Sequence, residues 1–65
     1  MIEALGDGDP SVRVFAAQAL AKLGAAEALP SLRALLNDHE KSRLGNPITV
    51  AEAAATAIAK LEGKP

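Results

Sequence analysis

The sequence predicts an all-α protein, a short α-solenoid of about two helix pairs in which the first helix is incomplete. Three observations lead to this prediction. Apolar residues recur at helical spacing, signals for helix ends flank the periodic segments, and one segment repeats another at a fixed distance. Residues 1–65 are expected to form one domain, with a first repeat at about 1–24 and a second at about 26–62.

The first long helix is predicted over residues 9–24. Asp9 can accept hydrogen bonds from the free amides of the first turn, and Pro10 suits the first helical position. Gly24 supplies the left-handed residue that ends a helix. The main apolar stripe is Val12, Ala16, Ala19, Leu20 and Leu23. A second stripe, which predicts packing on two sides and leaves Arg13, Gln18 and Lys22 toward water, is Val14, Ala17 and Ala21.

Two further helices and a helical turn complete the pattern. Residues 1–5 resemble the last turn of a helix that Gly6 ends, and residues 27–37 predict a shorter helix with Pro30 in its first turn. Residues 49–62 predict the last helix, because Thr49 followed by Glu52 forms a capping box, although Asn46-Pro47 is a competing start signal. The apolar stripes of these two helices are Leu29, Leu32, Leu35 and Leu36, and Val50, Ala54, Ala57, Ile58 and Leu61.

The last helix repeats the first at an offset of 38 residues. When residues 11–23 are laid over 49–61, seven of thirteen positions are identical. Four of the identities are alanines, which mean little in a chain with 15 alanines, but Val12/Val50, Lys22/Lys60 and Leu23/Leu61 keep the same alignment. The repeating unit is therefore a helix, a turn and a second helix.

The run DGDPSVRVFAAQALAKLGAAEALPSLRALLND is similar to HEAT-like repeats of the phycobilisome-lyase type. The similarity rests on Asp-Pro, Val-Arg, Ala-Ala-x-Ala-Leu and Leu-Gly, followed by an Ala-Leu-Pro helix start, and it weakens in the second copy, where Ala51 replaces the arginine. The resemblance implies a solenoid whose stacked helix pairs form a docking surface without chemistry of their own. Some members of this type help attach bilin chromophores, so it also implies an accessory role in a bilin lyase.

Composition excludes several classes of function. Seven basic residues against eight acidic ones give a formal charge of −1, and the chain holds one aromatic residue, Phe15. Nucleic-acid binding is therefore disfavoured, although some HEAT-like proteins bind DNA through basic concave faces. No apolar run reaches the roughly 18 residues of a membrane span, and the start lacks the basic residues of a signal peptide. The absence of cysteine favours a cytoplasmic protein.

The polar residues that could carry chemistry have simpler interpretations. Asp7 and Asp9 resemble the opening of a calcium loop, but no glutamate follows at loop position twelve, so a turn and a helix cap are expected. His39 is expected to be a solvated loop residue, with a pH-sensitive partner contact as the alternative. Catalysis by His39 with Ser42 lacks an orienting third group. We therefore predict no enzyme activity, no cofactor and no metal site.

Residues 38–48 form a loop about six residues longer than the corresponding turn in the first copy. An enlarged loop can serve a contact or can simply be tolerated, because loop closure costs little. Leu44 and Ile48 are its apolar members and are expected either to pack on the helices or to meet a partner.

The remaining candidate contact residues lie on the long helices. Arg13, Lys22 and Lys60 are expected on the outward faces that line the concave side, where Lys22 and Lys60 would stand side by side and could meet an acidic partner. The alternative is an ordinary solvated surface, with Arg13 paired to Asp9. A smooth surface suited to helix packing is expected from Ala51, Ala55 and Ala59. We therefore predict an interaction module that binds a protein partner or itself, as a two-fold homodimer or as part of a longer solenoid.

Overall fold

The computed structural model describes residues 2–42 and 48–63, which form helices joined by turns. In chain order they are the 3-10 helix η1 (Ile2–Gly6), α1 (Pro10–Leu23), the 3-10 helix η2 (Ala26–Ala28), α2 (Leu29–Ala34), the 3-10 helix η3 (Leu35–Asn37) and α3 (Val50–Leu61). The predicted fold class, a short all-α solenoid, is confirmed.

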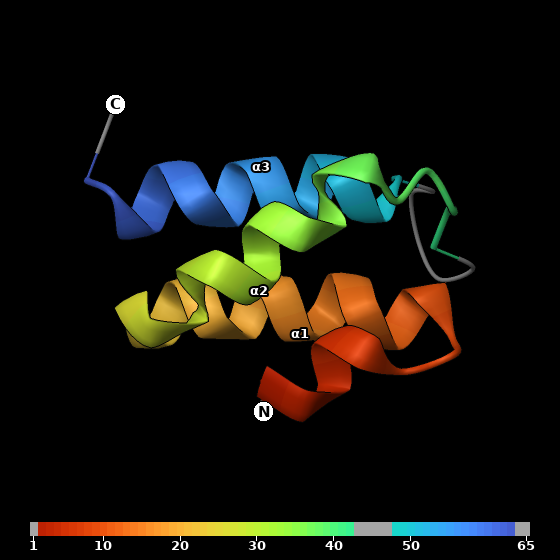
Figure 1. The fold of residues 1–65 in the computed structure, drawn as a ribbon, viewed down its shortest axis with the longest axis horizontal. Coiled ribbons are helices and arrows are strands. Elements are labelled where there is room, and N and C mark those ends of the chain that lie inside the picture. The colour runs from red at the N-terminus through yellow and green to blue at the C-terminus, as the bar shows by residue number, and fades with distance from the viewer. Residues whose placement is uncertain (1, 43–47, 64–65) are drawn as a thin grey trace.

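The two long helices lie side by side and run in the same direction, as Figure 1 shows. The segment from η2 to η3 returns between them on one side, so α2 runs opposite to α3 and packs against it. On the same side η1 packs against α1. The arrangement is therefore one antiparallel helix pair stacked on a second pair whose first member is a single short turn.

The ends of α1 follow the predicted signals. The Asp9 side chain accepts a hydrogen bond from the Ser11 amide at 2.9 Å, and Pro10 takes the first helical position, where its missing N–H costs nothing. Gly24 ends the helix with a φ of 68°, a left-handed conformation that glycine adopts without a steric penalty. Asp7 accepts a hydrogen bond from the Asp9 amide at 2.9 Å, so the two aspartates form the expected turn and cap.

The helix predicted over residues 27–37 is divided into three segments. It begins at Ala26, and only Leu29–Ala34 has α-helical geometry, with a 3-10 turn on either side. Pro30 explains the late start, because it has no N–H to donate to the Ala26 carbonyl as a continuous α-helix would require. Leu32 is fully buried, whereas Leu36 is 42% exposed, so the predicted leucine stripe is only partly in the core.

The helix α3 begins after Thr49, as the capping box predicts. The Thr49 hydroxyl oxygen accepts a hydrogen bond from the Glu52 amide at 3.0 Å. The first two amides of the helix donate to the preceding loop. The Val50 amide donates to the Glu40 carbonyl at 2.9 Å, and the Ala51 amide donates to the Asp38 carbonyl at 2.8 Å. The first part of the enlarged loop therefore caps α3. The competing start signal at Asn46-Pro47 lies outside the described residues.

Within residues 2–42 and 48–63, six of the eleven buried apolar residues are alanines, so the helices approach each other closely. These eleven are Leu5, Val14, Ala16, Ala17, Leu20, Ala28, Leu32, Val50, Ala53, Ala54 and Ala57. The predicted main stripe of α1 is wrong at its ends, because Val12 is 37% exposed and Leu23 is 70% exposed. The buried side is instead centred between the two stripes, since the main neighbours of α1 among the described elements are α3 and η1.

Candidate interaction surfaces

A groove runs between α1 and α3 and has a volume of about 230 Å³. Its walls come from both helices, and Ile48 closes one part of it. The lining residues are Gln18, Ala21, Lys22, Ile48, Ala53, Thr56, Ala57 and Lys60. Because three of these are alanines and one is isoleucine, the floor is apolar, while amide, hydroxyl and ammonium groups surround it.

Lys22 and Lys60 both line this groove, and both side chains are exposed. The two residues occupy equivalent positions of the repeat, so the parallel stacking of α1 on α3 places them on the same side. Among the described residues that line the groove none is acidic. The groove can therefore offer two positive charges beside an apolar floor, without an internal counter-ion.

The outer side of α1, turned away from α3, exposes its largest apolar side chains. Phe15 and Leu23 are each 70% exposed, Val12 is 37% exposed, and Ala19 between them is half-buried. These residues are spaced three, four and four positions apart and so form one continuous face. We call Val12, Phe15, Ala19 and Leu23 the outer face of α1. Adjoining exposed apolar side chains are typical of surfaces that contact other proteins.

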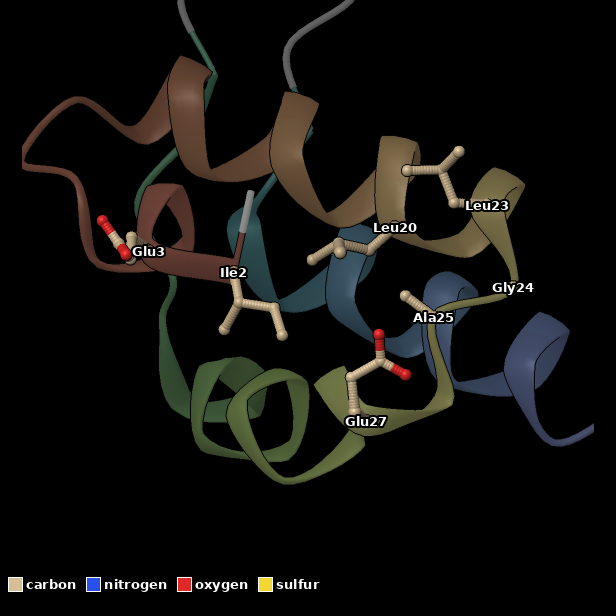
Figure 2. A pocket seen from close by; sticks show the side chains of 7 residues that line it. All are labelled: Ile2, Glu3, Leu20, Leu23, Gly24, Ala25 and Glu27. Carbon is tan, nitrogen blue, oxygen red and sulfur yellow. The ribbon is translucent and has the colours of Figure 1, made fainter.

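A second hollow lies between η1 and the end of α1, with a volume of about 490 Å³. Figure 2 shows Ile2, Leu20 and Leu23 around it, with the Glu27 carboxylate reaching into the space beside Ile2. Leu23 belongs both to this hollow and to the outer face of α1, so the two apolar surfaces are continuous. The hollow offers apolar contact and carboxylates, but no arrangement for chemistry.

The other predicted contact residues fall in different environments. Ala55 is exposed, while Ala51 and Ala59 are half-buried. Ile48 is half-buried and packs against the core. Of the two alternatives for this end of the loop, packing on the helices is therefore favoured over contact with a partner. Leu44 lies outside the described residues, so its role stays a prediction.

Arg13 does not point to water as predicted. Its side chain is 13% exposed, lies 3.3 Å (Nη1 to Oδ2) from Asp38, and donates a hydrogen bond to Glu40. It therefore clamps α1 to the capping segment 38–40, and the predicted pairing with Asp9 is replaced by these two carboxylates. The long-range contact could not be found from helical spacing, because it joins residues 27 positions apart.

The clamp keeps Arg13 charged. The hydrogen bond with Glu40 is the main cause that raises the pKa of Arg13 above its ordinary value, burial acts in the opposite direction, and the carboxylates of Asp38, Glu40 and Asp7 add to the rise. A group whose pKa is raised on folding stabilises the fold at every pH below its unfolded pKa. This contribution is lost only in strong alkali.

We expect Arg13→Gln to lower the free energy of unfolding by about 1 to 2 kcal/mol, because it leaves the partly buried Asp38 without its cation. The matched control is Arg33→Gln, since Arg33 pairs with Glu62 at 2.9 Å but its side chain is 57% exposed. That pair is worth less than about 1 kcal/mol. Urea unfolding followed by circular dichroism measures both variants. Equal losses in the two would contradict the clamp.

The residues weighed for chemistry form no site in the described part of the chain. His39 is exposed, as expected for a loop histidine. Residues 2–42 and 48–63 contain no group of three potential metal ligands. None of their helices is long and apolar enough to cross a membrane. The Ser42 hydroxyl donates to the Ser11 hydroxyl at 3.5 Å, a buried contact that again joins the loop to α1.

The comparison with known proteins agrees with this geometry. A family model described as HEAT repeats matches residues 1–65. No curated protein and no solved structure matches the chain. HEAT repeats generally mediate protein interactions, and the family is typically not enzymatic. Because the match spans the sequence and the structure is a stack of helix pairs with exposed helix faces, this chain belongs to the HEAT repeat family.

Proposed function

We propose that the protein is a non-enzymatic interaction module whose groove between α1 and α3 receives an acidic segment of a protein partner. The observation that carries the proposal is the pairing of Lys22 with Lys60 along one groove that has an apolar floor and no acidic lining residue among the described ones. A cytoplasmic location, which rests on composition alone, stays a prediction.

The chemistry of the groove suits a peptide with carboxylates on one side and small apolar groups on the other. Ala21, Ala53 and Ala57 give the groove an apolar lining of small side chains, and Gln18 and Thr56 can hydrogen-bond a peptide backbone. Two ammonium groups attract carboxylates at long range, and that attraction is strongest at low salt. Specific recognition therefore depends on both charge and shape.

The test uses a hexaglutamate peptide as the probe in a nuclear magnetic resonance titration of the isotope-labelled protein. We expect amide shifts at Ala21, Thr56 and Ala57, and we expect these shifts to weaken as salt is added. A variant with Lys22→Glu and Lys60→Glu should bind at least about tenfold more weakly, since both attractive charges become repulsive.

The matched control for this test is Lys41→Glu, because Lys41 is also exposed but does not line the groove. This variant changes the net charge in the same direction and should keep most of the binding. Absence of groove shifts at millimolar peptide, or an equal loss of affinity in the control, would overturn the proposal.

An accessory role in a bilin lyase is the second candidate. It is supported by the resemblance of residues 7–38 to repeats of the phycobilisome-lyase type. Co-expression with a bilin and an apo-phycobiliprotein tests it directly, through chromophore attachment with and without this chain.

A further inference from the structure

The repeat makes a prediction about the outer face of α1. Val50, Ala53 and Ala57 lie on the buried side of α3, at 0%, 3% and 1% exposed, and Ala53 and Ala57 line the groove with α1. At the offset of 38 their equivalents on α1 are Val12, Phe15 and Ala19. These three belong to the outer face of α1, where Phe15 is 70% exposed. The outer face of α1 therefore carries the same positions that α3 uses to bind its neighbour.

The lining of the groove extends this correspondence at the same offset. Its α3 wall consists of Ala53, Thr56, Ala57 and Lys60. The residues 38 positions earlier are Phe15, Gln18, Ala19 and Lys22, and these four line another hollow of about 140 Å³ on the outer side of α1. The outer side of α1 therefore carries the equivalents of the four α3 residues that line the groove. No described helix lies opposite them.

The complementary surface lies at the other end of the stack. Ala21 lines the groove with α3, and Val14 and Ala17 share its side of α1. The equivalents of these three residues on α3 are Glu52, Ala55 and Ala59. Glu52 and Ala55 are exposed and Ala59 is half-buried. Small side chains at Ala55 and Ala59 leave space for a ring as large as that of Phe15.

We infer that a second copy of this chain covers the outer face of α1, with the Ala55 side of its α3 packed against Phe15. The inference rests on the proposed function in that both use helix faces to bind protein. It involves the outer face of α1, none of whose four residues lines the groove, although the hollow beside that face shares Gln18 and Lys22 with the groove. The two contacting surfaces differ, so the association is head-to-tail and not the two-fold dimer expected from the alanine surface alone. In this association, α3 of one copy would pack against α1 of the next through positions equivalent to those that join α1 to α3 within one chain.

The test measures the weight-average mass of the full chain by sedimentation equilibrium, with Phe15→Glu and Ala55→Glu as the key variants. The wild-type mass should keep rising with concentration, because a head-to-tail contact leaves a free face at each end. Each variant alone should remain monomeric. An equimolar mixture of the two should form a dimer, since each retains the face that the other has lost.

The matched control is Leu36→Glu, which charges an exposed apolar residue on η3 that belongs to neither face, and should associate like the wild type. Circular dichroism checks that each variant is folded, and Leu23→Glu replaces Phe15→Glu if the latter unfolds.

A monomeric wild type at millimolar concentration overturns the inference. So does a mass that levels off at about twice the monomer, or self-association that Ala55→Glu retains, because these indicate a two-fold dimer or another occupant. The variants at Phe15, Ala55 and Leu36 change no residue that lines the groove, so peptide binding can be measured in each of them and the two proposals fail separately.

Discussion

Replacing Leu32 by alanine is expected to leave most of the chain unfolded at room temperature. Leu32 lies in α2, is 0% exposed, and is one of the three largest fully buried side chains. Removing such a leucine costs about 2 to 5 kcal/mol, from lost transfer free energy and the cavity that remains. A core of this size rarely supplies more than about 3 to 5 kcal/mol in total. The loss is therefore comparable with the whole stability of the fold.

Thermal and urea unfolding followed by circular dichroism at 222 nm, the standard helix band, measures this effect. The control is Leu36→Ala, since Leu36 lies four residues later, on the adjoining η3, but is 42% exposed. We expect the control to cost less than about 1 kcal/mol, in line with the apolar area that it removes from contact. Equal unfolding in both variants would mean that α2 does not hold the core.

Ala17→Leu is expected to have the second largest effect, a loss of about 1 to 3 kcal/mol or more. Ala17 is 0% exposed on α1 and shares the side of Val14 and Ala21, which faces α3. Three added carbon atoms at this position must push α1 and α3 apart or force side chains out of their rotamers. A gain in apolar content should thus reduce stability.

The control for Ala17→Leu is supplied by the repeat itself. Ala55 is the equivalent residue on α3, has the same side chain in the same helical position, and is exposed. In dilute solution, where copies do not associate, Ala55→Leu should change the free energy of unfolding by less than about 0.5 kcal/mol. If the two variants behave alike, close packing of alanines does not hold α1 against α3.

The local signals along the chain were sufficient to predict most of the helix ends. Asp9, Pro10 and Gly24 delimit α1, and Thr49 starts α3, because hydrogen bonds to free amides and left-handed backbone involve only neighbouring residues. The offset of 38 residues also predicted that α1 and α3 are equivalent, and in the structure the two lie parallel. These properties depend on contacts within a few residues of the chain or on direct comparison of two segments.

The surfaces were harder to predict. Helical spacing placed Val12 and Leu23 in the core, yet both are exposed. Spacing shows which residues share a side of a helix, but only the positions of the neighbouring helices show which side is covered. The spacing of Phe15, the one aromatic residue, from Val12, Ala19 and Leu23 places the four on one side of a helix, but does not show that this side is exposed.

The fold class, most of the helix ends, the repeat and the supply of alanine for close packing can all be inferred from the sequence, because each follows from local hydrogen bonding, side-chain size or periodicity. The ion pairs of Arg13 with segment 38–40, the groove that Lys22 and Lys60 share, and the exposure of the outer face of α1 became visible in the folded chain. The physical reason is that an ion pair, a groove and an exposed face each require two elements to be placed in space. Helix periodicity describes one element at a time.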